Sequence, residues 1–549
     1  SISQNGTFIA LLALTIATAA PHVSAREIHV PRDFAIIQRA VDASKSGDVI
    51  LVSPGTYSER LVLKPNISVR SIGDNTKGKQ GLQRAENTKL VHPEGKGAGV
   101  TMAMNSRLDG FTITGVGQYD EEAWNQHHAT QGEDQEMRHI GASGTPGIAV
   151  NDTCQVVYNI VHHIGYTGIA ITGVKGQKVE PKIEHNICYR NMGGGIGIMR
   201  GANPLVIHNT SFENFYAGIG FSEANGTLMH NHCYRNIRAG IGISENSSPT
   251  LENNHCHHNR RAGIGIRTGK DTQPLIKNNL CTDNGMAGIG SKQNAQPRIT
   301  GNTCLRNKLA GIGCKEDANA TITGNTCKNN DLSGIGLNGA RATLSNNKCE
   351  ENGTAALGLE NGSVATATDN ILIGKTVVAI GVRNGSQLTA KNNKVSRNGG
   401  MPPLFAVLEK SHLNLSGSQL EGGGVAAVLV DGNAVLTDNK MIGNGPRKGG
   451  PPNFAAWVKP SSVLKFERNK VSGWRHAVHS DKPKQILVSQ NEISNFLGTA
   501  IVIRNAMNPP TITENYARSD DPNAKVMDVL GKIGSTTGNL LLKKDGNPR

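Results

Sequence analysis

Apolar and polar residues alternate in short runs along most of the chain, and these runs recur at a nearly constant spacing. A Gly-Ile pair marks the repeat, at intervals of 21 to 27 residues. Its glycines are Gly147, Gly168, Gly195, Gly218, Gly240, Gly263, Gly288, Gly311 and Gly334. Apolar residues at alternate positions are typical of strands with one buried face. The spacing predicts a solenoid whose coils each pack against their neighbours.

A second column of polar residues follows the same period. Asn occurs at 159, 186, 209, 231, 254, 279, 302, 325, 347, 370 and 393, and Cys often follows two positions later. The coil therefore reads N-x-C-x-x-N-x-x-x-G-I-G-I, which predicts three short strands separated by polar turns. Asn tolerates left-handed backbone and hydrogen-bonds within turns, so we expect the stacked Asn side chains to form a ladder.

These patterns predict an all-β protein, a right-handed parallel β-helix solenoid with an N-terminal capping helix. An amphipathic helix is expected over residues 33–41, within a cap and first coil at 26–75. The solenoid is expected over 76–517 and a C-terminal cap over 518–549. The caps are needed because an open solenoid exposes strand edges at both ends.

The start of the chain resembles a secretory signal peptide. Residues 8–20 are an apolar run, too short to span a membrane, and the small residues 23–25 follow. No Lys or Arg precedes the run, which departs from the usual pattern. We expect a signal peptide at 1–25, a secreted or periplasmic protein, and no membrane span.

The amino-acid composition indicates which kinds of ligand the protein can bind. Aromatic residues make up 4% of the chain, and 57 Lys and Arg against 43 Asp and Glu give a net charge of +14. A basic surface attracts polyanions, although the charge is also explained by solubility alone. We expect an acidic polysaccharide as the partner, rather than nucleic acid, and predict no oligomeric state.

The coil, together with the opening IQRAV…SGDVILVSPGTYSERL, resembles the pectate-lyase-like superfamily over most of residues 27–517. It is especially similar to the carbohydrate-binding and sugar-hydrolase repeat branch, and to periplasmic accessory proteins of nitrous oxide reductase. The resemblance implies the β-helix fold. It implies no single activity, because the superfamily holds lyases, hydrolases, epimerases and non-enzymes.

Seven of the nine cysteines share one inward column, namely Cys188, Cys233, Cys256, Cys281, Cys304, Cys327 and Cys349. Three interpretations are open: buried thiols packed as small apolar groups, disulfides between adjacent coils, and a line of soft-metal thiolates. The parallel Cβ directions of stacked residues favour free thiols.

If the Cys column points inward, its neighbours point outward and form a patch of rings and cations. We predict catalytic roles for Tyr189, Arg190, Tyr234, Arg235 and His257. We predict substrate binding by His162, His163, Phe212, His232, His255 and His258, and by Arg238 and Arg261 beside the Gly-Ile strands. Rings can stack on sugars, and Arg can pair with carboxylates. A stacking ladder that only stiffens the sheet is the alternative.

Residues 116–142 interrupt the repeat just before the aromatic coils, and the segment is rich in acids. It is expected to be a lid over the rings, a source of carboxylates for Ca²⁺, or a solvated loop. No metal site is assigned, and Glu133, Asp134 and Glu136 are the candidates for Ca²⁺. The run His255-Cys256-His257-His258 is not expected to converge on a metal, because strand alternation separates Cys256 from its neighbours.

Three functions compete. The first is a lyase or epimerase acting on a polyuronate, in which Tyr or His removes the C5 proton and Arg neutralises the developing charge. The second is a non-catalytic periplasmic accessory or binding protein with a link to metal. The third is a structural adhesin. Hydrolysis ranks lower, because two facing carboxylates are needed and few acids lie near the patch.

Overall fold

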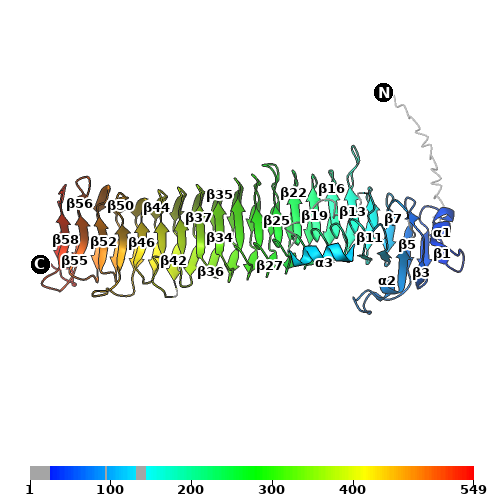
Figure 1. Ribbon diagram of the computed structural model, residues 1–549, viewed down its shortest axis with the longest axis horizontal. Helices are drawn as coiled ribbons and strands as arrows, with labels where there is room; N and C mark the ends of the chain where they lie inside the picture. The colour runs from blue at the N-terminus through cyan, green and yellow to red at the C-terminus, as the bar shows by residue number, and fades with distance from the viewer. Residues whose placement is uncertain (1–24, 93–94, 131–143, 398, 549) are drawn as a thin grey trace, which may run out of the picture.

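The chain forms an elongated solenoid in which three parallel sheets run side by side along one axis (Figure 1). The computed structural model describes residues 25–92, 95–130, 144–397 and 399–548. Each coil contributes one strand to each sheet, and every strand pairs in parallel with its counterpart in the next coil. The predicted all-β parallel solenoid is therefore confirmed.

The first sheet, sheet A, starts with the strands nearest the N-terminus and ends close to the C-terminus. Its first strands are β1 (Glu27–Val30), β2 (Val49–Val52), β5 (Ser68–Ser71), β8 (Arg107–Asp109) and β11 (Gln155–Val157), and its last are β53 (Gln485–Ser489) and β56 (Thr511–Thr513). The middle residue of most of these strands is buried, which gives sheet A its inward apolar column.

Sheet B carries the Cys column and the predicted ring patch. Its strands are β3 (Gly55–Tyr57), β6 (Thr88–Val91), β9 (Thr112–Thr114), β12 (Ile160–His162), β15 (Ile187–Tyr189), β18 (Thr210–Phe212), β21 (His232–Tyr234), β24 (His255–His257), β27 (Leu280–Thr282), β30 (Thr303–Leu305), β33 (Thr326–Lys328), β36 (Lys348–Asn352), β39 (Ile371–Gly374), β42 (Lys394–Arg397), β45 (Gln419–Glu421), β48 (Lys440–Ile442), β51 (Lys470–Ser472), β54 (Glu492–Ser494), β57 (Tyr516–Arg518) and β59 (Leu540–Leu542).

Sheet C carries the Gly-Ile repeat. It begins with β4 (Leu61–Val62), β7 (Val100–Thr101) and β10 (Ile148–Val150), continues through β19 (Ile219–Ser222), β22 (Ile241–Ser244) and β25 (Ile264–Ile266), and ends at β55 (Thr499–Arg504) and β58 (Lys525–Leu530). The Ile side chains of these strands point into the core, as the alternation predicts.

The two glycines of each Gly-Ile-Gly motif have different tasks. A Cβ on Gly240 would lie 2.7 Å from the side-chain nitrogen of Asn259 and 2.8 Å from the carbonyl of Gly263, so no larger residue fits. A Cβ on Gly242 would meet only the Ala217 methyl, at 3.6 Å. The first glycine therefore permits close packing of coils, and the second leaves a bare strip on the outside.

The predicted Asn ladder is present and buried. The side-chain oxygen of Asn231 accepts a hydrogen bond at 3.0 Å from the backbone N–H of Asn209. The side-chain amide N–H of Asn231 in turn donates to the side-chain oxygen of Asn254 at 2.9 Å. A second ladder runs at the other end of sheet B, where Asn236 donates to Asn259 at 3.0 Å. Buried polar groups are stable only when paired, so the two ladders fix the turns on both sides of the sheet.

The nine cysteines are all free and buried. Sheet B places Cys233, Cys256 and Cys281 directly above one another, and S–H···S contacts link neighbours in the column. Burial raises the pKa of the Cys188 thiol. The cysteines pack as free thiols, so the disulfide interpretation is wrong, and the soft-metal thiolate interpretation stays a prediction.

The N-terminal end is capped as predicted. Helix α1 (Ile37–Ala43) buries Ile37, Ala40 and Val41 against the first coil. At the other end, strand pairing continues past residue 517 through β58 and β59. Almost all of the expected signal peptide lies outside the described residues. Among the described helices, none is long and apolar enough to cross a membrane.

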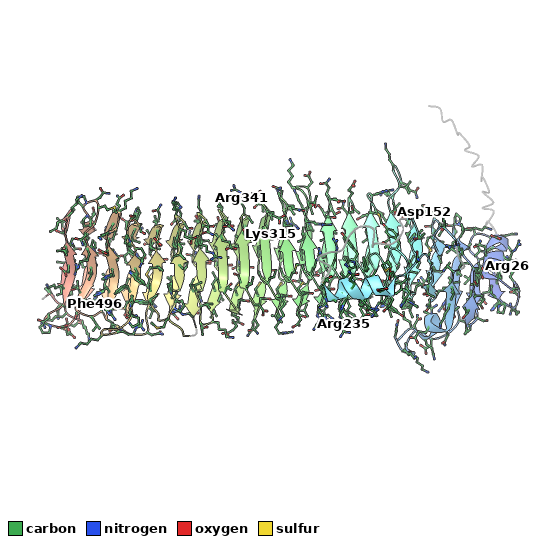
Figure 2. The ribbon with its side chains drawn as sticks, viewed as in Figure 1. Arg26, Asp152, Arg235, Lys315, Arg341 and Phe496 are labelled. Atoms are coloured by element: carbon green, nitrogen blue, oxygen red, sulfur yellow. The ribbon has the colours of Figure 1, made fainter. Side chains whose placement is uncertain are left out.

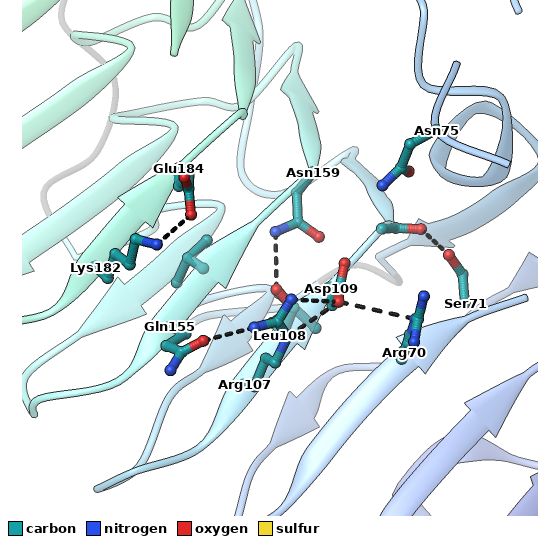
Figure 3. Close-up of polar contacts among 12 residues, drawn as sticks. Arg70, Ser71, Asn75, Arg107, Leu108, Asp109, Gln155, Asn159, Lys182 and Glu184 are labelled. Carbon is teal, nitrogen blue, oxygen red and sulfur yellow. Dashed lines mark hydrogen bonds and ion pairs between the residues drawn. The ribbon is translucent and has the colours of Figure 1, made fainter. Parts of the chain in front are cut away.

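A short segment with helix α2 (Gln83–Asn87) leaves the solenoid near its N-terminal end (Figure 1). A buried ion pair between Arg84 and Asp109 holds it in place. The Asp109 carboxylate also pairs with Arg107 at 2.8 Å and lies 3.9 Å from Arg70 (Figure 3). Leu82 and Ala85 pack on the outer face of sheet B, so this segment closes one end of that face.

Candidate functional site

The outer face of sheet B carries the predicted column of rings. Five rings from successive strands are stacked, with centroids 4.8 to 5.0 Å apart and interplanar angles of 2° to 15°. They belong to His162, Tyr189, Phe212, Tyr234 and His257. The stacking follows from the parallel register, which places each third strand position above the next.

Because the rings cover each other's faces, the column presents mainly ring edges and phenol hydroxyls. The Tyr189–Phe212 and Phe212–Tyr234 spacings of 4.9 Å leave no gap for a sugar ring. The stacking-ladder interpretation therefore describes the inner rings, and a ligand on this face meets their edges. The hydroxyls of Tyr189 and Tyr234 and the ring nitrogens supply its hydrogen-bonding groups.

A group of three imidazoles lies beside the C-terminal end of this column, next to Tyr234 and His257. The nearest ring nitrogens of His232, His255 and His257 all lie within 4.8 Å of one another. The Nε2 atoms of His232 and His257 are 2.6 Å apart, so an N–H on one ring donates to the other. Cys256 points inward and stays apart from its flanking histidines, as expected, but those histidines converge with His232, which the alternation pattern did not predict. Both point outward from one strand, and the preceding coil supplies the third ring.

The protonation of these groups is set by partial burial. Burial, together with the charges of His255, His232 and His258, lowers the pKa of His257 to about 4. Burial also lowers the pKa of His232 and of His255. Burial raises the pKa of the Tyr234 hydroxyl. At neutral pH the imidazoles are uncharged and the phenol keeps its proton, so a proton acceptor on this face is an imidazole.

The two predicted catalytic arginines have different surroundings. Arg190 bonds Glu213 at 2.8 Å and Glu121 at 2.7 Å, and its guanidinium lies 3.7 Å above the Trp124 ring. Arg235 has 62% of its side chain exposed and lies 4.0 Å from Glu213 (Figure 2). Arg190 therefore works as an anchor, whereas Arg235 presents its charge to solvent.

The remaining predicted binding residues lie in the turn after sheet B. His163 contacts His162 through their Nδ1 atoms at 2.7 Å, and His258 contacts His257 in the same way at 2.8 Å. Arg238 lies further round the turn and donates to the Tyr216 hydroxyl at 3.1 Å. Arg261 follows on the next coil, where its N–H bonds the Arg238 carbonyl. The structure thus pairs His163 with His162 and His258 with His257 on coils four apart, and places these two arginines on a separate edge.

Sequence comparison identifies the family. Three overlapping matches to the family described as the right handed beta helix region cover residues 136–274, 238–372 and 310–451, more than half of the chain. The chain belongs to this family. No curated protein matches the sequence, and the expected likeness to nitrous oxide reductase accessory proteins stays a prediction.

Several solved structures are similar to this chain at low identity and low TM-score. The periplasmic alginate epimerase AlgG is 12% identical with a TM-score of 0.40, over 61% of this chain and 80% of that one. The GH87 alpha-1,3-glucanase of Streptomyces thermodiastaticus is 14% identical with a TM-score of 0.41, over 63% and 61%. The A-module of the Azotobacter vinelandii mannuronan C-5 epimerase AlgE6 is 16% identical with a TM-score of 0.32, over 75% and 95%. These likenesses concern the fold alone.

The acidic insertion of this β-helix folds onto the turn beside the rings. Helix α3 (Glu121–Ala129) runs along the solenoid axis (Figure 1). Trp124 packs with Met192, Phe215 and Ile237 from three coils, and its indole N–H donates to the Glu213 carbonyl at 2.8 Å. The described part of the insertion, α3, thus covers the turn beside the rings and not the rings themselves, and the lid and Ca²⁺ interpretations stay predictions. Glu133, Asp134 and Glu136 lie outside the described residues.

Sequence reasoning missed the far half of the same face. Two shallow hollows of about 270 and 180 Å³ lie on sheet B toward the C-terminus. Their charged lining is Lys440, Lys470, Arg518 and Glu492 in one, and Lys394 and Glu421 in the other. The signal was available in the first position of several sheet B strands, where Lys recurs after residue 328 at Lys348, Lys394, Lys440 and Lys470.

Proposed function

We propose that this β-helix binds a linear acidic polysaccharide along the outer face of sheet B and acts on it as a polyuronate lyase or epimerase. The observation that carries the proposal is the cluster on β21 and β24. It brings uncharged imidazoles, a protonated Tyr234 hydroxyl and the exposed Arg235 guanidinium together on one open face.

Charge and shape support an extended anionic ligand. The chain has a net charge of +14, and the face continues from the rings to the Lys-lined hollows near β48 and β51. A chain of linked sugars needs a long open surface rather than a deep pocket. The carboxylates along the polysaccharide pair with Arg and Lys side chains on such a surface.

The proposed chemistry begins with removal of the C5 proton by the uncharged imidazole of His232 or His257. Arg235 stabilises the negative charge that develops on the uronate carboxylate. In elimination, the C4–O4 bond breaks, O4 takes the electron pair and the Tyr234 hydroxyl protonates it, leaving a C4–C5 double bond. The imidazolium proton then returns to the phenolate through solvent. In epimerisation, O4 stays attached, C5 takes a proton from solvent on its other face, and the imidazolium releases its proton to solvent.

The test is incubation of the protein with polyuronates, using a neutral glucan as control. Elimination is followed by absorbance near 235 nm, and epimerisation by NMR of the product. Tyr234→Phe and Arg235→Gln are expected to lower turnover at least tenfold, in line with the loss of a general acid or a charge stabiliser. Tyr516→Phe, an exposed tyrosine of β57 on the same sheet, is the matched control and is expected to keep full activity.

The outcomes separate the competing functions. Turnover that survives both substitutions contradicts the assigned site. Polysaccharide binding without turnover favours the accessory or binding function. The mutual stacking of the rings is consistent with that function too. Absence of both, together with a stable trimer, favours the adhesin hypothesis.

A further inference from the structure

The three outward imidazoles on β21 and β24 form a nitrogen cluster of their own. His255 and His257 project from one strand, with ring centroids 4.6 Å apart, and His232 stacks on His255 at 5.1 Å from the previous coil. Among the described residues this is the one group of three ligand-type side chains whose atoms converge so closely. The other histidine stack, His185, His208 and His230, does not bring its nitrogens so close, because stacked rings at 5.0 and 5.1 Å keep them apart.

The backbone holds the cluster in place. All three residues lie within β-strands whose register is fixed by parallel pairing, His232 opposite His255. The intervening Cys233 and Cys256 are completely buried, which locks the direction of each strand. A site built on strands keeps its ligands in position better than a site on loops.

Contacts around the cluster orient two of its rings. The Nδ1 atom of His257 faces Nδ1 of His258 at 2.8 Å, which directs Nε2 of His257 toward His232. Nε2 of His255 lies 3.5 Å from the Thr282 hydroxyl. Such outer contacts are a regular feature of histidine metal sites, where they fix the ring orientation.

We propose that His232, His255 and His257 bind a single transition-metal ion of the Zn²⁺ or Cu²⁺ class. Imidazole nitrogens favour these ions, whereas Ca²⁺ and Mg²⁺ favour oxygen ligands. With three protein ligands and an open outer side, the ion keeps at least one position for water or a ligand, which is the pattern of reactive rather than structural zinc sites.

The required movement is small. Zinc–nitrogen bonds of about 2.0–2.1 Å place tetrahedral ligands roughly 3.3 Å apart. The 2.6 Å pair of His232 and His257 must open slightly, and the widest pair, at most 4.8 Å, must close. Rotation of the partly exposed rings about their side-chain bonds is sufficient, and the strands need not move.

The metal site stands apart from the polysaccharide proposal, because metal binding is measured without sugar. The two uses of the rings exclude each other, since a coordinated nitrogen cannot accept the C5 proton. If both proposals hold, Zn²⁺ inhibits turnover and chelation restores it. Chelation that abolishes turnover contradicts the assignment of the base while leaving the metal site intact.

The test uses the full chain, freed of metal and titrated with Zn²⁺ by calorimetry. Co²⁺ is used in parallel, because its visible absorption reports a nitrogen-coordinated ion. One equivalent is expected to bind to the wild type. His232→Ala, His255→Ala and His257→Ala are each expected to weaken the affinity on the order of 100-fold or more, beyond the 10–100-fold typical for loss of an outer contact.

The chain offers a matched control in its other histidine column. His185, His208 and His230 stack at 5.0 and 5.1 Å but lie on a different edge, beside sheet A. His208→Ala is expected to change Zn²⁺ affinity less than twofold. No uptake by the wild type, unchanged affinity of His257→Ala, or an equal loss in His208→Ala would overturn the proposal. Circular dichroism of each variant separates loss of a ligand from loss of fold.

Discussion

The two halves of the outer face of sheet B differ in chemistry although they share one backbone. From β12 to β24 the face carries stacked rings and imidazoles, and α3 covers the adjoining turn. From β33 to β57 the same positions carry Lys, Glu and Ser around shallow hollows. The inward position of the strands stays buried throughout and is mostly Cys and then Leu, Val or Met, with Ser211 of β18 as a polar exception.

This comparison shows how a solenoid separates stability from function. Inward positions must fit the coils above and below, so they repeat. Outward positions meet only their column neighbours and solvent, so a short stretch of the chain can specify a local surface. Five ring-bearing coils are enough to produce a stack and the adjoining imidazole cluster.

The largest expected difference between the halves lies in the Asn ladder. Asn231 accepts from both the backbone N–H and the side-chain amide of Asn209, whereas Asn439 accepts only from the backbone N–H of Ser418. A buried N–H left unpaired costs about 1–3 kcal/mol, and a further lost bond about 0.5–1.5 kcal/mol. Asn439→Ala is therefore expected to lower the free energy of unfolding by about 1–3 kcal/mol, and Asn231→Ala by more. Urea denaturation checks this, and equal losses would contradict the role of the second bond.

Two glycines of one coil, Gly240 and Gly242, compare a closely packed position with a position that has room for a methyl group. Gly240→Ala is expected to destabilise by about 1–3 kcal/mol through overpacking, because its Cβ would meet Asn259 and Gly263 below 3.0 Å. Gly242→Ala changes a position with room for a methyl group and is expected to shift stability by less than about 0.5 kcal/mol. The thermal midpoints of the two variants give the measurement. Equal shifts would contradict the distinction between the two glycines.

The contrast also explains what the sequence could predict. The coil, the Asn ladder at Asn231 and the inward Cys column follow from periodicity alone, because stacking equivalent positions is the only way such a repeat buries its apolar face. The ring column was predictable for the same reason. Its mutual stacking could be offered only as one of two interpretations, since the sequence places Tyr189 and Phe212 on one column without giving the ring planes.

The imidazole cluster could not be predicted by alternation within a single strand. Alternation separates Cys256 from His255 and His257, but it says nothing of a third ring supplied by His232 from the neighbouring coil. In the same way, the anchoring of Arg190 depends on α3, which no repeat pattern specifies. Contacts between coils and insertions need the structure.

Polysaccharide affinity tests whether the ligand uses both halves of the face. Arg235→Gln in the first half and the double substitution Lys440→Ala, Lys470→Ala in the second each remove exposed charge. An exposed ion pair contributes about 0.2–1 kcal/mol, so Arg235→Gln is expected to weaken binding about 1.5- to 5-fold and the double substitution about 2- to 30-fold. Binding is measured by calorimetry at two salt concentrations. Loss in only one set of variants would confine the ligand to that half.

The smallest expected effect is acid loosening of α3, the element that sets the two halves apart. The Tyr119 hydroxyl donates to the Glu121 carboxylate at 2.7 Å, and Arg190 pairs with it at 2.7 Å. The hydrogen bond from Tyr119 and the charge of Arg190 hold the pKa of the exposed Glu121 carboxyl below its ordinary value of 4.5. A depressed carboxyl pKa gives stabilisation that is present above the ordinary value and lost as pH falls through the folded value. Amide hydrogen exchange of residues 121–129, corrected for intrinsic rates, is therefore expected to accelerate below about pH 4.5. Glu121→Gln is expected to weaken the pH dependence of amide exchange in α3. Its helix neighbour gives the control: Glu122→Gln is expected to leave that pH dependence unchanged, because only Glu121 contacts Arg190. If both variants keep the wild-type pH dependence, Glu121 does not anchor the helix.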